Sequence, residues 1–319
     1  MVSGMAGMMS GTSDNNFPAA IRLGLCCIFK NEPIRFRSTT AKYLRQFPRD
    51  VQRAQLSTIC QHNCLSLLAG LRFVQHYGIG AFRVLSPFFP RYTHPDVGYT
   101  ITDLPEHQKI LHTLSQIKQY QDRHDIRLSF HPDQFIILSS PQPQVVANSI
   151  NELEYQGLLA EYIGAETITM HGGGKYDDKE SALLRFTNNF HRLSPRVTSR
   201  LTLENDDRVY TVHDLIPICT RLNIPLVYDV HHHRCNPDGL SVEQATGMAL
   251  ESWDRVGREP YFHLSSPKNG WQEGRPEPHA DYIDPADFPE CWKNLRITVD
   301  IEAKAKELAV LALKKTFTV

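Results

Sequence analysis

The stretch Arg200-Leu201-Thr202-Leu203-Glu204-Asn205-Asp206 joins a short apolar run directly to three polar side chains. A run of this length, rich in aliphatic residues and closed by carboxylate or amide groups, is typical of a buried parallel strand with a polar carboxyl end. The same arrangement recurs along the chain. Eight such runs are found, at residues 21–26, 81–85, 127–130, 167–170, 200–203, 226–228, 261–264 and 296–299.

Longer amphipathic segments separate these runs, at 51–76, 104–124, 145–163, 179–193, 212–222, 242–253 and 302–315. Strands that alternate with helices predict an α/β fold, and eight strands predict a closed (β/α)8 TIM barrel. An open doubly wound sheet is the alternative. No GxGxxG follows the first run, and Gly172-Gly173-Gly174 lacks the Lys-Ser/Thr of a P-loop. We expect one barrel domain over 21–319 after a disordered or flexible tail at 1–20.

The composition indicates an ordinary globular chain. Of 319 residues, 41% are hydrophobic and 22% charged, and the formal net charge is −1, so no overall positive field indicates a nucleic-acid partner. No apolar run is long enough to span a bilayer. The seven cysteines are odd in number and show no paired CxxC spacing, which argues against a disulfide framework and a thiolate zinc site. We expect a cytoplasmic monomer without membrane association.

Polar side chains that can bind metals follow six of the runs. They are His131, His171, Glu204, Asp229 with His231-His232-His233, His263, and Asp300 with Glu302. In a barrel these strand ends converge on one mouth, where active sites lie. Each residue alone has a plainer interpretation: a lone histidine after a strand is usually structural, Glu204 could cap a helix, and 229–233 could be a solvated loop. Six strands together favour metal binding.

Mixed imidazole and carboxylate ligands suit manganese, zinc or iron better than calcium or magnesium. Several carboxylates among several histidines suggest more than one ion, because a carboxylate can bridge two. Paired ions activate water and clamp the oxygens of a phosphoryl displacement, so no Ser or Cys nucleophile is required. The residues therefore predict a metal-dependent hydrolase.

Two motifs are more specific, Leu203-Glu204-Asn205-Asp206 and His131-Pro132-Asp133-Gln134-Phe135. With the others, which follow in order from about residue 21 to 310, they resemble the UV damage endonuclease family. The other motifs are Arg22-Leu23-Gly24, Thr93-His94-Pro95, His171-Gly172-Gly173, the segment from Tyr228-Asp229 to His233, His263-Leu264-Ser265-Ser266 and His279-Ala280-Asp281.

The resemblance implies a barrel related to endonuclease IV with two to three divalent ions, most often manganese, with zinc or magnesium as alternatives. By position, His131, His171 and Glu204 would hold one ion, with His94 nearby. Glu204 would bridge to a second ion held by Asp229, His263 and Glu302, and His232 and His279 would hold a third. Glu204, His232 and His279 would act in catalysis. Metal-activated water would nick duplex DNA 5′ to a UV photoproduct, a pyrimidine dimer or 6-4 photoproduct, leaving a 3′-hydroxyl and a 5′-phosphate.

Gln134 and Phe135 match the family's probing pair, which enters the gap left when the lesion is flipped out of the duplex. The plainer interpretation of Phe135 is packing in a strand over 135–138. Further DNA contacts are expected from the loops after the first two runs, at Lys30, Arg35, Arg37, Lys42, Arg91 and Tyr92.

Two departures from the family pattern bear on the site. Tyr261 stands where the family often has a lysine, reported as carboxylated and metal-bridging, which puts the third ion in doubt or requires another ligand such as His231. Leu25 stands where the family has an aromatic residue, and Phe29 in the same loop is the candidate replacement. The rival functions are an abasic-site endonuclease, a metal-dependent sugar isomerase or epimerase, and a lesion-binding protein without catalysis.

Overall fold

The computed structural model describes residues 21–176 and 178–317, and the predicted tail at 1–20 lies outside them. Eight parallel strands form a closed barrel in sequence order, with β8 pairing to β1. The strands are β1 Ile21–Cys26, β2 Ala81–Val84, β3 Arg127–Phe130, β4 Thr167–His171, β5 Leu201–Glu204, β6 Leu226–Asp229, β7 Tyr261–Leu264 and β8 Ile297–Ile301. The predicted TIM barrel is confirmed, and the open doubly wound sheet is wrong.

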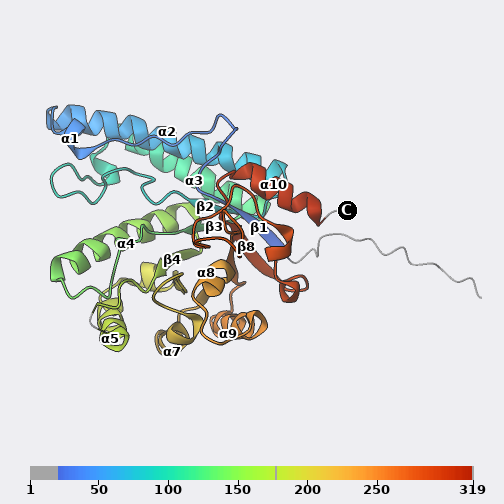
Figure 1. The fold of residues 1–319 in the computed structure, drawn as a ribbon. Helices are drawn as coiled ribbons and strands as arrows, with labels where there is room; N and C mark the ends of the chain where they lie inside the picture. Colours follow the sequence, from blue (N-terminus) through green and yellow to red (C-terminus); the bar gives the residue numbers. More distant parts are fainter. Residues whose placement is uncertain (1–20, 177, 318–319) are drawn as a thin grey trace, which may run out of the picture.

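Helices surround the barrel (Figure 1). They are α1 Ala41–Leu44, α2 Arg49–His76, α3 His107–His124, α4 Pro143–Ile163, α5 Lys179–Phe190, α6 Pro195–Thr198, α7 Val212–Leu222, α8 Val230–Cys235, α9 Val242–Asp254 and α10 Glu307–Thr316. The long helices α2 and α3 pack against each other on one side of the barrel, and α5, α7 and α9 cover the opposite side.

Local signals in the sequence start and stop these helices. Capping boxes begin α7, where Thr211 and Asp214 exchange side-chain and backbone hydrogen bonds, and α9, where Ser241 and Gln244 do the same. Gly164 ends α4 in a left-handed conformation with φ +76°, which glycine adopts without steric cost. These short-range contacts fix where each helix leaves its strand, and so keep the connecting loops at the two ends of the barrel.

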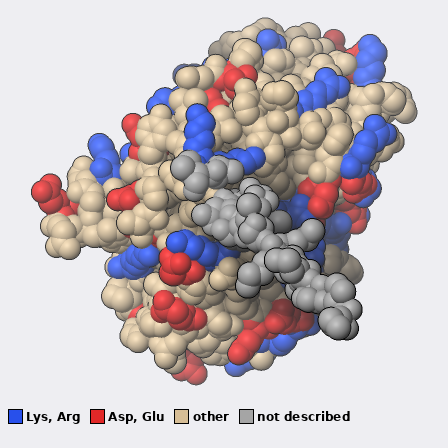
Figure 2. Space-filling view, turned by 90° about the vertical axis from the view of Figure 1, so that its right-hand side faces the viewer, with Lys and Arg blue, Asp and Glu red and all other residues tan. Residues whose placement is uncertain are grey.

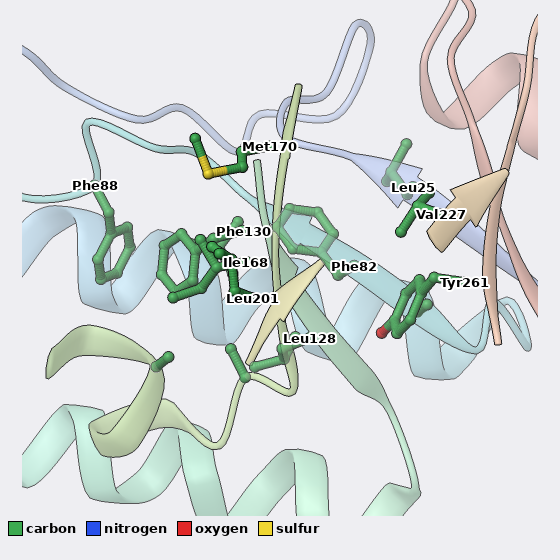
Figure 3. Close-up of a cluster of buried hydrophobic side chains, with 14 of the residues drawn as sticks. Leu25, Phe82, Phe88, Leu128, Phe130, Ile168, Met170, Leu201, Val227 and Tyr261 are labelled. Atoms are coloured by element: carbon green, nitrogen blue, oxygen red, sulfur yellow. The ribbon is translucent and has the colours of Figure 1, made fainter. Parts of the chain in front are cut away.

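The strands alternate between an apolar outer face and a polar inner face. Phe82, Phe130 and Ile168 are among the buried hydrophobic side chains grouped in Figure 3, and Phe82 lies against α2 beside Gly70. The neighbouring residues on each strand point into the barrel. Thr202, for example, donates a hydrogen bond to Thr169 on the adjacent strand. Because successive side chains on a strand point to opposite faces, each strand buries apolar groups under helices and carries polar groups into the barrel.

Ion pairs cover the end of the molecule where β1 begins. Arg22 pairs with Asp125 and with Glu259, and Glu259 also pairs with Arg296. Figure 2 shows Lys and Arg interspersed with Asp and Glu on this side, without a continuous basic surface. Among the described residues, no helix combines the length and apolar character needed to cross a membrane. All seven cysteines are free.

Candidate metal centre

Glu204, at the carboxyl end of β5, is the centre of the polar cluster at the barrel mouth. Its side chain is 1% exposed. One carboxylate oxygen, Oε2, lies 2.7 Å from His131 Nε2, and the other, Oε1, lies 3.0 Å from His263 Nδ1. Glu204 therefore contacts histidines from β3 and β7, on opposite sides of β5.

Two groups of ligand atoms share this glutamate. His131, His171 and Glu204 form one, and Glu204, Asp229 and His263 form the other; within each, one ligand atom per residue lies within 4.8 Å of the rest. Burial also leaves His171 Nδ1 and Asp229 Oδ2 without a hydrogen-bond partner. Buried polar atoms are seldom left unpaired unless a water or ion completes them. The donor set therefore fits divalent cations, and Glu204 belongs to both groups that could hold one.

The charge states of Glu204 and His171 suit cation binding. Burial raises the pKa of Glu204, but His263, His171 and His131 outweigh it and hold that pKa well below its ordinary value, so the carboxylate is ionised. Burial lowers the pKa of His171, which keeps this imidazole neutral and its lone pair available. An ionised bridging carboxylate beside a neutral imidazole is the state in which both can act as ligands.

The polar run after β6 folds into the short helix α8, and the solvated loop considered for 229–233 is wrong. Asp229 caps this helix by accepting the backbone N–H of His232. The turn places His232 Nδ1 3.3 Å from Glu204 Oε1. His233 points away and contacts the Tyr228 hydroxyl at 2.6 Å, so its role is structural. His231 is buried beside His279, with ring centroids 5.1 Å apart.

Glu302 and His279 extend the cluster toward β8. Glu302 Oε1 lies 3.5 Å from His263 Nδ1, and Glu302 Oε2 lies 3.7 Å from His279 Nδ1. The predicted helix start at residue 302 is wrong, because α10 begins at Glu307 and leaves Glu302 directly after β8. The structure thus brings together all the predicted ligands except His94.

His94 lies apart from both ligand groups, in a groove of about 690 Å³ between the loop after β2 and α4. Its Nδ1 accepts the backbone N–H of Asp96 at 3.1 Å. Tyr92 lines the same groove, where its ring stacks on Tyr155 with centroids 4.7 Å apart. One face of Tyr92 is therefore used in packing.

Arg83 is a site residue that the sequence analysis missed. It lies on β2 with its side chain 8% exposed, and its guanidinium reaches across the barrel. It donates to Asp300 Oδ2 at 3.1 Å and to Glu302 Oε1, and it contacts His263 Nε2 at 2.8 Å. One signal in the sequence could have identified it. A charged residue stands inside a strand-like run, at a position where the alternation of side chains along a strand directs it into the barrel.

Tyr261 lies among the buried side chains of the barrel (Figure 3). It is 1% exposed, and the Arg127 guanidinium stands 4.0 Å from its ring centroid. Tyr261 pairs in register with Thr298, whereas His263 pairs with Asp300, nearer the mouth. In this place Tyr261 contributes packing.

Gln134 and Phe135 form an exposed turn immediately after the β3 ligand His131. Phe135 is 71% exposed, and its backbone N–H is held by the Asp133 carboxylate at 3.0 Å. The alternative of a strand over 135–138 is wrong, because these residues form no strand. One cavity of about 310 Å³ is lined by Gln134 together with His171 and His232, so the turn and the ligand cluster share a space.

The predicted basic contacts lie mainly on the loop between β1 and α1. Lys30, Arg35, Arg37 and Arg91 are exposed. Buried Glu307 at the start of α10 accepts the backbone N–H groups of Lys30 at 2.7 Å and Asn31 at 2.6 Å. The loop that carries these charges is therefore fixed by a carboxylate, in a conformation that leaves the cationic side chains in solvent, where phosphates can reach them.

The prediction that Phe29 replaces the family's aromatic residue, where this chain has Leu25, is wrong. Phe29 is 5% exposed, and it packs edge-on against Phe73 and stacks on Phe82. Leu25 is fully buried in the same core. Neither side chain can contact a bound molecule at the mouth.

A TIM barrel whose mouth gathers histidines and carboxylates around one shared glutamate belongs to the class of barrels with a candidate metal centre. Within it, the family model described as UV-endonuclease UvdE matches residues 21–318. The chain belongs to this family of DNA repair endonucleases. It is 33% identical over 297 residues to the UV DNA damage endonuclease of Bacillus velezensis, covering 90% of this chain and 89% of the relative. The corresponding protein of Bacillus pumilus is 33% identical over 284 residues, 86% of each chain.

Solved structures agree. The crystal structure of SacUVDE matches with a TM-score of 0.82 and 26% identity, over 93% of this chain and 97% of that one. Endonuclease IV from Thermus thermophilus matches at 0.58 and 14% identity, covering 93% and 97%, and D-psicose 3-epimerase from Clostridium cellulolyticum at 0.55 and 11%, covering 93% and 96%. These last two likenesses show the fold alone.

Proposed function

We propose that this protein nicks duplex DNA immediately 5′ to UV photoproducts, namely pyrimidine dimers and 6-4 photoproducts, and leaves a 3′-hydroxyl and a 5′-phosphate. The observation that carries the proposal is the shared cavity between the exposed Gln134-Phe135 turn and the ligands His171 and His232. A group that probes a damaged duplex and a group that cuts its backbone must act within one or two nucleotides of each other, and this cavity supports that arrangement.

In this proposal the centre holds two or three divalent ions, with manganese expected and zinc or magnesium as alternatives. His131, His171 and Glu204 hold one ion, and Glu204, Asp229, His263 and Glu302 hold another; His232 and His279 are the further ligands. Such ions supply Lewis acidity, lower the pKa of a coordinated water and stabilise charge on the phosphodiester. The carboxylates themselves exclude competing anions until cations neutralise them.

The residues of the chain position the substrate. Phe135, 71% exposed on a short turn, inserts as a wedge where the crosslinked bases leave the stack, and the poor stacking of such a lesion lowers the cost of extrusion. The Gln134 amide, with two donors and one acceptor, meets the unpaired opposite bases. Lys30, Arg35 and Arg37 bind phosphates along the strand, a contribution that weakens as salt rises.

The test uses the purified protein with manganese and a labelled duplex that contains a single thymine dimer. Nicking directly 5′ to the dimer, with ligatable 3′-hydroxyl and 5′-phosphate ends, supports the proposal. Cleavage confined to a duplex with an abasic site would favour the rival endonuclease, and turnover of ketohexoses without nicking would favour an epimerase. Glu204→Ala should abolish cutting while lesion binding persists in part. The exposed carboxylate Glu251 on α9 offers a matched control, because Glu251→Ala should cut normally.

A further inference from the structure

The loop between β5 and α7, residues 205–211, is held in shape by one carboxylate. The Asp206 side chain accepts the backbone N–H groups of Arg208 and Tyr210, each at 2.9 Å. The same carboxylate accepts the N–H of Val209, and the Asp206 N–H donates to the Tyr210 carbonyl at 2.8 Å. These hydrogen bonds close the loop into a defined turn, so the backbone of Arg208 has a fixed place.

Tyr210 fastens this loop to the loop that follows β4. Its side chain is fully buried, and its hydroxyl donates to the Gly174 carbonyl at 3.4 Å. A Cβ on Gly172 would lie only 2.7 Å from the Tyr210 ring, so the ring packs there because residue 172 is a glycine. Gly172 directly follows the candidate ligand His171. The two loops are therefore packed together beside the metal centre, and Arg208 belongs to a part of the molecule that is fixed relative to it.

Arg208 lines the cavity of about 310 Å³ that Gln134 shares with His171 and His232. All the lining residues belong to the described part of the chain, and Arg208 is the one arginine or lysine among them. Its side chain is 72% exposed, and its Nε lies 3.5 Å from the carboxylate of the adjacent Asp207. An exposed ion pair of this kind contributes little. The terminal nitrogens can therefore bind a phosphate, whose oxygens match the planar fork of a guanidinium.

The place of Arg208 between the probing turn and the ligands indicates which phosphate it meets. In the proposed function the metal centre holds the phosphodiester on the 5′ side of the photoproduct, and Gln134 enters the gap that the photoproduct leaves. The next phosphodiester along the strand is the one inside the crosslinked dinucleotide, and it lies between these two points. This linkage is the same in pyrimidine dimers and in 6-4 photoproducts, although the bases are joined differently.

We propose that Arg208 binds the phosphodiester inside the crosslinked dinucleotide, and that this contact lets one site accept both kinds of photoproduct. The inference rests on the proposed function and names the group of the substrate that one further residue binds. A contact to the backbone positions the strand without reading the bases. Discrimination between damaged and intact duplex remains with Gln134 and Phe135.

The test measures kcat/KM for nicking by the whole chain with manganese, on duplexes that carry one thymine dimer. The first duplex has native phosphates, the second has a neutral methylphosphonate inside the dimer, and the third has the methylphosphonate well beyond the dimer on its 3′ side. Arg208→Gln should lower kcat/KM about tenfold on the native duplex, because a charge-assisted hydrogen bond is lost. The methylphosphonate inside the dimer should lower the wild-type value by a similar factor. It should have almost no further effect on Arg208→Gln, because both changes remove the same contact.

Two further variants and a second lesion complete the design. Arg208→Lys keeps the positive charge without the planar fork and should recover part of the loss. Arg221→Gln replaces an exposed arginine in the last turn of α7 and is the matched control, which should behave as the wild type. On a 6-4 photoproduct, Arg208→Gln should lose activity by the same factor as on the dimer, since the contact does not involve the bases.

Independent effects of Arg208→Gln and of the methylphosphonate inside the dimer would overturn the inference, and so would coupling of Arg208→Gln to the distant methylphosphonate. A loss confined to one of the two photoproducts would overturn the claim that the contact is common to both. Failure of the wild type to nick the native dimer duplex would instead refute the proposed function, which separates the two failures.

Discussion

Replacing Gly24 by alanine tests how tightly the polar interior of the barrel is packed. A Cβ at this position on β1 would lie 1.9 Å from Asp300 Oδ1 and 3.3 Å from the Asp300 backbone Cα. Ordinary contacts need about 3.5 Å, so the carboxylate must move by roughly 1.5 Å. Its strand cannot follow, because β8 is paired to β1 through Ile21 to Leu25. The 3.1 Å contact between Asp300 and Arg83 would be lost.

The expected cost combines two effects. Overpacking of a dense interior costs about 1–3 kcal/mol, and loss of a hydrogen bond between buried charged groups adds about 1.5–3 kcal/mol. A total near 4 kcal/mol should lower the Tm of the metal-free protein by about 8 °C, at roughly 2 °C per kcal/mol for a chain of this size. Calorimetry with chelator present measures this without contributions from bound ions.

Gly247 provides the control. It lies inside α9 with nothing within 4 Å of an added Cβ. Gly247→Ala should therefore raise the free energy of unfolding by about 0.4–1 kcal/mol. In an Asp300→Ala background the clash is gone, and Gly24→Ala should then cost less than about 1 kcal/mol. A Gly24→Ala protein that melts within about 2 °C of wild type, or one equally destabilised in both backgrounds, would refute the reasoning.

Three further predictions concern binding. Burial lowers the pKa of His232, but the neighbouring carboxylates outweigh it and raise that pKa well above its ordinary value. A metal ion that binds His232 must therefore displace a proton. Manganese affinity should rise with pH until the pH exceeds this raised pKa. Calorimetry in buffers of different ionisation enthalpy should register proton release, and its absence would contradict the assignment. Phe135→Ala should reduce the preference for dimer-containing over intact duplex about tenfold in anisotropy titrations. The reason is that stacking contributes about 1–3 kcal/mol per base. Leu65→Ala, which truncates an exposed leucine on α2, should leave this preference unchanged. Glu307→Gln should weaken duplex binding several-fold at unchanged manganese content, because loop 30–32 loses its carboxylate acceptor. Equal affinity in the variant and the wild type would show that the loop holds its shape without the carboxylate.

The strands were predictable because each pairs an apolar run with an abrupt polar end. Those at β1, β3 and β7 match their predicted bounds, and the other five differ by one or two residues at one or both ends. Much of the difference has one cause: at β4, β5 and β6 the ligand itself, such as His171 or Glu204, still belongs to the hydrogen-bonded ladder. Burial at the barrel mouth keeps a polar residue inside a strand that hydropathy alone would end earlier.

The loops were predicted less well, because their contacts join distant parts of the chain. Phe29 follows a strand as a lesion-contacting aromatic would, yet it fills the space over Gly70 on α2, where an added Cβ would meet its ring at 3.2 Å. Phe135 shows the reverse case. Its local sequence fits a strand, but the Asp133 side chain closes a turn and leaves the ring exposed. The outcome at Phe29 depends on a helix far along the chain, whereas the turn at Phe135 depends on Asp133, a local signal that the strand interpretation overlooked.

The departure at Tyr261 belongs to the packing of the barrel interior. Position 261 stands one inward step below His263 on β7, and its ring lies 4.0 Å from the Arg127 guanidinium. A lysine at this position would lose that contact and bring a second positive charge beside Arg127. Tyr261→Lys alone is therefore not expected to add an ion, because the rest of the interior is arranged around the tyrosine ring.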